Sequence, residues 1–223
     1  MIDRKHTNRL LNTVGTCAVL IAMAITWNYF SPRDPIASIP DIVMVSDRQW
    51  QIALGAGHRI GSATASVTAV VFADFQCPAC REFALNTLNP VLAKFPTQLA
   101  VLHRHWPLNY HAFAIAAARA SECAADQGRF KEYHDALFRL QNTIGHSDWV
   151  EYTREIAGID TTRFIECSNG TMFGSTIERD ARDAVALGGS GTPMILVNGR
   201  LLSGVPDAEA FEHFVRNVID SIK

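Results

Sequence analysis

The hydrophobic pattern is clearest in the first half of the chain, where two short apolar runs flank an amphipathic segment. Residues 67–75, VTAVVFADF, are apolar and β-branched, which is typical of a buried strand. Apolar residues then recur at helical spacing through residues 83–95, and Pro90 inside this stretch predicts a kink. Residues 98–107, QLAVLHRHWP, predict a second strand. The pattern therefore predicts a strand–helix–strand unit.

The middle of the chain, residues 110–187, has no convincing strand pattern. An alanine-rich run at residues 111–126 strongly favours a helix. Shorter helices are expected after it, several of them beginning at a Ser or Asp that can cap a helix N-terminus. They are predicted at residues 129–141, 147–158, 160–168 and 175–188.

The chain ends in a predicted hairpin and a helix. Residues 192–204 form two apolar runs around Asn198-Gly199, a dipeptide that favours the tight turn of a β-hairpin. Residues 207–223 then show amphipathic helical spacing, with Asp207 as the expected N-terminal cap.

These elements predict one domain over residues 47–223. Without the helical insertion at about 110–187, the element order is βαβ–ββα, which is the order of the thioredoxin fold. We therefore expect an α/β protein with a thioredoxin fold and an inserted helical subdomain.

Near the start of this domain, Gly55, Gly57 and Gly61 predict a turn between short strands. Their spacing, with no helical pattern after them, does not fit a nucleotide-binding loop.

Residues 1–30 resemble a targeting segment. They begin with the basic residues Arg4, Lys5 and Arg9 and end in a run of 21 residues without a charge. A membrane-spanning helix needs about 20 apolar residues, so one interpretation is an uncleaved signal anchor. The alternative is a signal peptide, cleaved after the small-x-small motif at residues 22–24. Under both interpretations the positive-inside rule places the body outside the cytoplasm.

Residues 31–46 contain three prolines and predict an extended linker between this segment and the domain. The whole chain is 48% hydrophobic and 19% charged, an ordinary globular composition. Its formal net charge is −2, with no basic cluster in the domain, so no nucleic-acid partner is expected. We expect a monomer that needs no cofactor.

Two cysteines spaced Cys-x-x-Cys directly follow the first predicted strand. Cys77 lies at the junction of strand and helix, where unpaired backbone N–H groups and the helix dipole favour a thiolate. Pro78 suits the first helical turn, because its missing N–H would have no partner there. Cys80 follows one turn later and faces back toward Cys77. We therefore expect a redox-active dithiol, with Cys77 as the exposed nucleophile and Cys80 as the more buried resolving thiol.

A zinc site or a purely structural disulfide is the alternative for such a pair. A zinc knuckle needs a second pair of ligands at a similar spacing, and the chain has no second Cys-x-x-Cys. His103 and His105 share one face of the second predicted strand, but two strand histidines are more often ordinary residues. We therefore expect no metal site, and the strand-to-helix position favours redox chemistry over a structural disulfide.

A second feature, GTPMILVNG, places Thr192 and Pro193 at the start of the hairpin. In a thioredoxin-type core, a proline here follows a cis peptide bond and opens the strand that faces the dithiol. The backbone of Thr192 would then be free to pair with a substrate strand beside the sulfur atoms. The alternative is that Pro193 merely begins a strand.

The segments VVFADFQCPACREF, ASECAADQGRFKEYHDALF and GGSGTPMILVNG together resemble the DsbA-like thiol–disulfide oxidoreductases of the thioredoxin superfamily. The resemblance covers residues 48–220. It implies that Cys77 and Cys80 form the active dithiol and that Pro193 is the cis-proline. It further implies export, reduced or unfolded exported proteins as substrates, and recharging by a quinone-linked membrane oxidase.

The chain departs from the family pattern at two positions. The pair between its cysteines is Pro78-Ala79, and the alanine offers neither a charge nor a hydrogen bond to a thiolate. The acidic residue found six positions before the nucleophile in many members is replaced by Val71. Asp74 is the nearest acidic residue, and we assign it no proton-transfer role.

Cys123 and Cys167 lie in the predicted helical insertion, 44 residues apart. Some members of the family carry a second disulfide in this region, and an exported protein permits one. The resemblance therefore implies a structural disulfide between them. The alternative is two free cysteines on buried helix faces.

The leading functional hypothesis is an oxidase that introduces disulfides into exported proteins, in the periplasm or outside the cell, at the inner membrane. A disulfide reductase or isomerase kept reduced by a membrane electron donor is the second hypothesis. A chaperone or assembly module without turnover is the third, although the intact Cys77, Cys80 and Pro193 argue against it.

Overall fold

The structure is a computed structural model that describes residues 21–23, 26 and 41–222. The predicted anchor or signal peptide lies almost wholly outside these residues, as does most of the predicted linker. Among the described residues, no helix is both long enough and apolar enough to cross a membrane. The chain divides into two compact units, Met1–Asp34 and Pro35–Lys223, and every labelled strand and helix belongs to the second.

A six-stranded sheet, in the order β1-β6-β5-β3-β4-β2, runs through the second unit. β3 and β4 are parallel, and every other neighbouring pair is antiparallel. This arrangement confirms the expected βαβ–ββα core, which β1 and β2 extend at the two edges. The strands are β1 Ile42–Met44, β2 His58–Gly61, β3 Val67–Ala73, β4 Leu99–His105, β5 Met194–Val197 and β6 Arg200–Leu202.

β3 is buried along its whole length, because strands lie on both sides of it and helices cover both of its faces. Its side chains alternate between two cores: Val71 belongs to one hydrophobic cluster and Phe72 to the other. The parallel register pairs Ala73 with His105, so β3 and β4 end at the same edge of the sheet. The loop that carries the dithiol therefore begins beside the end of β4.

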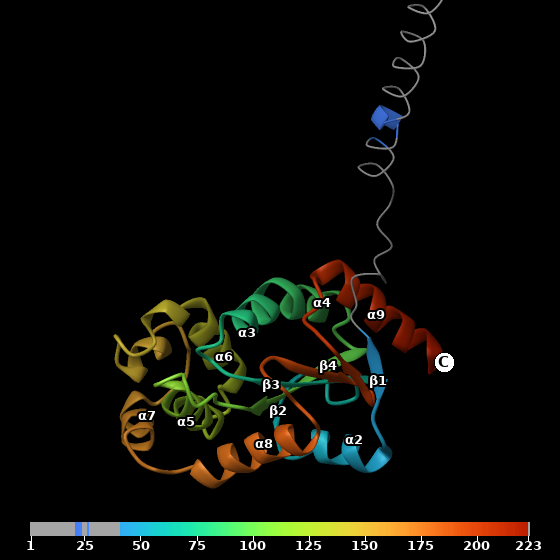
Figure 1. Cartoon of the computed structure of the whole chain (residues 1–223). Coiled ribbons are helices and arrows are strands. Elements are labelled where there is room, and N and C mark those ends of the chain that lie inside the picture. The colour runs from blue at the N-terminus through green and yellow to red at the C-terminus, as the bar shows by residue number, and fades with distance from the viewer. Residues whose placement is uncertain (1–20, 24–25, 27–40, 223) are drawn as a thin grey trace, which may run out of the picture. The chain divides into compact units, whose positions relative to one another are not determined.

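Helices cover both faces of the sheet (Figure 1). One face carries α9 and the helical segment that follows the dithiol, and the other carries α2 and α8. The segment after the dithiol passes from α-helix to π-helix and back, and its last part begins with Pro90 in its first turn, where the sequence predicts a kink. These elements are α2 Asp47–Leu54, α3 Pro78–Glu82, the π-helix η2 Phe83–Leu88, α4 Asn89–Lys94, α8 Gly174–Ala186 and α9 Ala208–Ser221.

Most of the predicted insertion forms a helical subdomain at one end of the sheet, whereas its last helix, α8, lies on a face of the sheet (Figure 1). A disulfide between Cys123 and Cys167 joins α5 to α7, with their Cα atoms 5.8 Å apart. Only a short 3₁₀-helix forms in the region 147–158, where a longer helix was expected, and Asp148 makes no side-chain capping bond to it. The elements are α5 Ala114–Ala125, α6 Phe130–Arg139, the 3₁₀-helices η3 Gln141–Thr143 and η4 Trp149–Thr153, and α7 Thr161–Ser168.

The residues before Gly55 form the helix α2, so the prediction of a short strand there is wrong. Ser46 caps this helix: its hydroxyl oxygen accepts a bond from the N–H of Gln49, while the side-chain oxygen of Gln49 accepts from the N–H of Ser46. This reciprocal capping box satisfies two N–H groups that would otherwise lack partners. Gly55 then ends the helix, and β2 begins at His58.

The predicted hairpin turn and the last helix cap are both confirmed. Asn198 and Gly199 have φ values of 44° and 80°, as a tight hairpin turn requires. The side-chain oxygen of Asn198 also accepts a hydrogen bond from the N–H of Thr68 at 2.8 Å, which fastens the turn to β3. At the start of α9, Asp207 accepts a hydrogen bond from the N–H of Ala210 at 2.8 Å.

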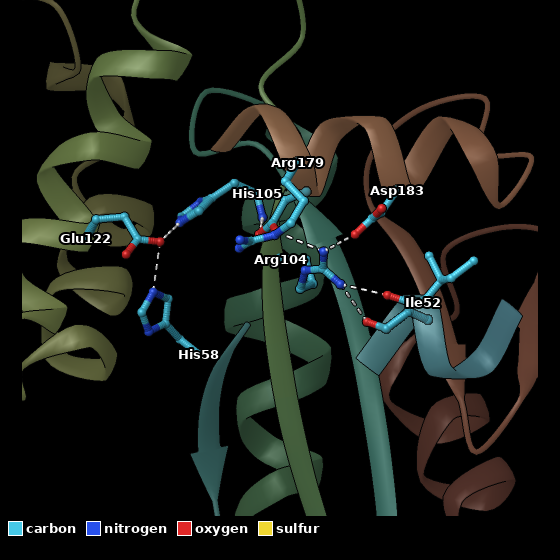
Figure 2. A network of polar contacts seen from close by, with 9 residues as sticks. Ile52, His58, Arg104, His105, Glu122, Arg179 and Asp183 are labelled. Carbon is cyan, nitrogen blue, oxygen red and sulfur yellow. Dashed lines mark hydrogen bonds and ion pairs between the residues drawn. The ribbon is translucent and has the colours of Figure 1, made fainter. Parts of the chain in front are cut away.

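A fully buried arginine joins the sheet to the two helices on one face (Figure 2). Arg104 of β4 donates hydrogen bonds to Asp180 and Asp183 of α8 at 2.8 and 2.6 Å. Its guanidinium also donates to the carbonyl oxygens of Ile52 and Ala53 in α2 at 3.0 and 2.9 Å. Because the buried charge of Arg104 is bonded to groups in both α2 and α8, these bonds fix the positions of the two helices relative to β4.

Candidate active site

The dithiol lies where β3 passes into α3. Cys77 is the N-cap residue of α3, with an extended backbone (φ −74°, ψ 119°), and Pro78 is the first helical residue. The side chains of Cys77 and Cys80 are both reduced, and they are 7% and 1% exposed. Cys77 is therefore more accessible than Cys80, as expected, but it is largely buried, and the expectation of an exposed nucleophile is wrong in degree.

The strand pairing explains why Cys77 is covered. Phe72 of β3 pairs with Met194 of β5, which brings the residues just before β5 over the end of β3. The Sγ atom of Cys77 lies 3.4 Å from the carbonyl oxygen of Thr192, to which the protonated form of the thiol donates a hydrogen bond. The peptide bond between Thr192 and Pro193 is cis, as expected. The two separate sequence features, CPAC and GTP, thus form one site.

The surroundings of the two sulfur atoms shift the pKa values of the two thiols in opposite directions. A hydrogen bond from Cys80 is the largest influence on Cys77 and, despite the opposing effect of burial, the pKa of the Cys77 thiol falls to about 5. The backbone groups of Ala79 and Cys80 at the start of α3 also lower this pKa. Burial raises the pKa of Cys80 well above its usual value. The site therefore holds one thiolate and one thiol near neutral pH.

A buried carboxylate lies beside the dithiol. Asp74 accepts hydrogen bonds from the N–H groups of Gln76 and Leu108, both at 2.7 Å, and from Nδ1 of His111 at 2.8 Å. The backbone N–H of Asp74 in turn donates to Sγ of Cys80 at 3.5 Å. Asp74 therefore fixes the loop between β3 and the dithiol, and its pairing with His111 has no local signature in the sequence.

The helical subdomain contributes one side chain to the same loop. The amide nitrogen of Gln141 donates hydrogen bonds to the carbonyl oxygens of Phe75 and Cys77, at 2.8 and 3.0 Å. These two bonds connect the loop to η3 across more than 60 residues of sequence. Sequence reasoning missed Gln141, because a single glutamine in a short 3₁₀-turn follows no recognisable pattern.

Two hollows flank the dithiol on the surface. Ala79 lies at the edge of one, with a volume of about 390 Å³, which Phe83 and Val205 also line. Pro193 and Met194 line the other, of about 320 Å³. Both hollows are open to solvent and adjoin the residues that contact the sulfur atoms, so they are suited to receive side chains of a bound polypeptide.

Within residues 41–222, Cys77 and Cys80 belong to no group of three or more side chains that could together hold a metal ion. The chemistry that this arrangement supports is thiol–disulfide exchange, in which a thiolate attacks a disulfide sulfur.

Sequence comparisons agree with this geometry. The family model described as thioredoxin matches residues 54–217. The Na⁺/H⁺ antiporter NhaA of Herminiimonas arsenicoxydans is 36% identical over 151 residues, which are 68% of this chain and 24% of that protein. The Na⁺/H⁺ antiporter NhaA 1 of Mycolicibacterium gilvum is 33% identical over 201 residues, covering 86% of this chain and 31% of that protein. The chain thus spans about a quarter to a third of these relatives.

Solved structures with the same fold include two bacterial proteins. BdbD from Bacillus subtilis has a TM-score of 0.65 and 20% identity, over 79% of this chain and 96% of its own. DsbA2 from Pseudomonas aeruginosa has a TM-score of 0.57 and 27% identity, over 75% of this chain and 95% of its own. The similarity spans both the sheet and the helical insertion.

Proposed function

The chain belongs to the thioredoxin family, and from this premise we propose that it is a DsbA-like thiol–disulfide oxidoreductase that introduces disulfides into exported proteins. Cys77 is the proposed nucleophile and Cys80 the proposed resolving cysteine. The observation that carries the proposal is the divided acidity of the pair, with the pKa of Cys77 lowered to about 5 and that of Cys80 raised.

The divided acidity favours the oxidising direction. A stabilised thiolate at Cys77 lowers the free energy of the reduced protein, so the Cys77–Cys80 disulfide becomes easier to reduce and a stronger oxidant. Thioredoxin, a reductant, has a nucleophile with a pKa of about 7, whereas the oxidant DsbA has one of about 3.5. A pKa of about 5 for Cys77 lies between these values and on the oxidising side of thioredoxin.

The proposed reaction exchanges two thiols for one disulfide. A client thiolate attacks Sγ of Cys77 in the Cys77–Cys80 disulfide, which forms a mixed disulfide and releases the Cys80 sulfur. Cys80 takes up a proton, as its raised pKa favours. A second client thiolate then attacks the client sulfur of the mixed disulfide, and Cys77 leaves as a thiolate. The client gains a disulfide, the protein gains two reduced cysteines, and one proton passes to solvent.

The residues around the sulfur atoms suit a polypeptide substrate. Thr192 and Pro193 precede β5, and we propose that the backbone of Thr192 pairs with an extended client segment beside Cys77. Client side chains would enter the hollow next to Ala79 and the hollow next to Pro193. Because both hollows are open to solvent, the site is suited to clients of varied sequence. Pro78 keeps the first turn of α3 rigid.

We further propose that the protein works outside the cytoplasm and that a quinone-linked membrane oxidase recharges its dithiol. The basic start and uncharged run of residues 1–30 support export, with this segment kept as an anchor or removed as a signal peptide. We do not propose antiport for this chain, because it spans only about a quarter to a third of the antiporters that it matches.

The reduction potential of the Cys77–Cys80 pair tests the direction. We expect equilibration with glutathione to place it well above the −270 mV or so of thioredoxin, toward the value of about −120 mV of a strong oxidase. The oxidised protein should also form disulfides in a reduced client, and the Cys77→Ser variant should not. A potential at or below that of thioredoxin would support the reductase hypothesis instead. Client binding without exchange would support the chaperone hypothesis.

A further inference from the structure

Three side chains from different elements converge on one point (Figure 2). The Oε1 atom of Glu122, in α5, lies 2.9 Å from Nε2 of His58 in β2 and 2.9 Å from Nε2 of His105 at the end of β4. All three atoms lie within 4.8 Å of one another. Within the described part of the chain, this is the one group of three or more side chains suited to hold a metal ion.

We propose that His58, His105 and Glu122 form a binding site for a divalent transition-metal ion of the zinc class. Zn²⁺ lies about 2.0–2.2 Å from histidine nitrogen and carboxylate oxygen ligands, so its tetrahedral ligand atoms lie about 3.3 Å from one another. The two separations from Oε1 of Glu122, 2.9 Å each, are slightly shorter than this value, and no two of the ligand atoms are more than 4.8 Å apart. Small side-chain rotations therefore convert the two hydrogen bonds into three metal–ligand bonds.

The rings are held in place by their neighbours. The ring of His58 stacks on that of Phe130, with centroids 4.1 Å apart, and the ring of His105 lies 6.1 Å from that of Phe75. Side chains that are already ordered lose little conformational freedom when they bind an ion. The group is thus preorganised by packing as well as by hydrogen bonds.

The two histidines differ in their exposure to solvent. His105 is 1% exposed, and its Nδ1 atom has no hydrogen-bond partner in the described structure. Its other ring nitrogen, Nε2, contacts Glu122, which is the only hydrogen-bond partner of the ring in the described structure. The side chain of His58 is 25% exposed, which provides the ion with a route from solvent. Solvent on that side would supply the fourth ligand.

The ligand chemistry selects the class of ion. Two imidazole nitrogens and one carboxylate oxygen suit Zn²⁺ and its transition-metal neighbours, whereas Ca²⁺ and Mg²⁺ prefer oxygen ligands only. An ion here would join the edge strand β2, its neighbour β4 and the helical subdomain through α5. We therefore assign it a structural role, in which binding to the folded chain alone raises the free energy of unfolding.

Sequence reasoning did not find this site, and the proposal departs from the expectation of no metal. The sequence pattern pointed instead to His103 and His105 as the histidine pair that could bind a metal ion. In the structure, His103 lies outside the group, and its Nε2 atom is buried without a partner. The actual partners of His105 come from positions 58 and 122, which are brought together by the antiparallel pairing of β2 with β4 and by the docking of α5.

The test is direct measurement of metal binding to the full chain in detergent, purified without an affinity tag. The protein is first oxidised, because the sulfur atoms of a Cys77–Cys80 disulfide are not zinc ligands. Competition with a chromogenic chelator measures the Zn²⁺ affinity, and the visible spectrum of added Co²⁺ reports tetrahedral coordination. We expect one tight equivalent and a higher melting temperature in the presence of Zn²⁺.

Two variants assign the ion to this group. Loss of an outer contact to a metal ligand typically weakens binding 10–100-fold, so His58→Gln, which removes a ligand outright, is expected to weaken it by more than about 100-fold. Glu122→Gln is expected to act similarly. His146→Gln, at an exposed histidine outside the group, should leave the affinity unchanged.

Absence of tight binding to the wild-type chain would overturn the proposal, as would equal affinity in the wild type and His58→Gln. Glu122 is buried and its variant could fail to fold. The partly exposed His58 keeps the test decisive in that case. Because the measurement uses the oxidised protein and reads no exchange activity, its outcome is independent of the proposed disulfide-forming function.

Discussion

The Sγ atom of Cys77 lies 3.4 Å from the carbonyl oxygen of Thr192, although 115 residues separate the two in sequence. The contact follows from the pairing of β3 with β5, which aligns the end of one strand with the start of the other. The hydroxyl oxygen of Thr192 is buried at the same place and has no partner in the described structure. Thr192 thus offers the nucleophile both an acceptor and a free donor.

Replacing the Thr192 hydroxyl is expected to raise the pKa of Cys77 above about 5, because this hydroxyl has no other partner and can turn toward the sulfur atom to stabilise the thiolate. Thr192→Val keeps the shape of the side chain and removes the donor. The ultraviolet absorbance of the thiolate, followed against pH, measures the midpoint. Thr192→Ser retains the hydroxyl and serves as the control, and equal midpoints in the valine and serine variants would contradict this role.

Replacing Cys80 is expected to raise the pKa of Cys77 further than Thr192→Val does, since the hydrogen bond from Cys80 is the largest influence on it. Cys80→Ala removes this donor, whereas Cys80→Ser replaces the thiol with a hydroxyl. The rate of alkylation of Cys77 against pH reports the midpoint in each variant. The pKa of Cys77 is expected to increase in the order wild type, Cys80→Ser, Cys80→Ala. A midpoint that stays near 5 in Cys80→Ala would contradict this prediction.

The stability of the reduced protein is expected to depend on pH in a way that the oxidised protein does not share. The pKa of Cys77 is about 5 in the folded state and about 8.5 in an unfolded chain. Between these values the unfolded state binds one more proton, so the free energy of unfolding rises with pH, and this gain disappears as the pH falls through about 5. In the disulfide form Cys77 does not titrate.

Urea unfolding of both redox forms between pH 5 and 8.5 measures this effect. The difference in free energy of unfolding, reduced minus oxidised, should increase across the range. Groups that titrate alike in both forms cancel from the difference, and the raised pKa of Cys80 acts only above this window. A difference that stays constant with pH would show that Cys77 is not a stabilised thiolate in the folded protein.

Removal of the Cys123–Cys167 disulfide is expected to lower the free energy of unfolding by about 2–5 kcal/mol. This disulfide joins α5 to α7 and restrains the unfolded chain across 44 residues. Denaturant unfolding of the double variant Cys123→Ala, Cys167→Ala measures the loss. Because we propose a structural role, disulfide exchange at Cys77 should stay within about twofold of wild type, and a large loss of exchange in a folded variant would argue for a redox role.

Replacing Arg104 is expected to destabilise the fold by about 3–5 kcal/mol, because the buried Asp180 would keep only the N–H of His105 and the more distant Arg179 as partners. Arg104→Met keeps much of the side-chain volume and removes the charge. Arg163→Met is the matched control, since Arg163 pairs with Asp126 at an exposed site, where such pairs contribute at most about 1 kcal/mol. Similar unfolding midpoints in the two variants would contradict a structural role for the buried pair.

The elements predicted correctly are those with strong local signals. Residues 67–75 contain the strand β3 because an apolar, β-branched run favours burial on both faces. Asn198-Gly199 forms the expected turn because both residues tolerate a positive φ. The misassigned segment before Gly55 shows the limit of such signals. There the glycines suggested a turn between strands, while the capping box of Ser46 and Gln49 started a helix.

Local sequence patterns are enough to predict the dithiol and its setting: two cysteines one helical turn apart, a proline that suits the first turn, and strands that are buried because they are apolar. These features depend on sterics and hydrogen bonds within a few residues. Which distant groups meet depends instead on the fold as a whole. The carbonyl oxygen of Thr192 contacts Sγ of Cys77, and the side chain of Gln141 donates to the carbonyl oxygen of Cys77. His58 and His105 both contact Glu122. Strand pairing and helix docking bring these residues together. Such contacts leave no periodic trace in the chain.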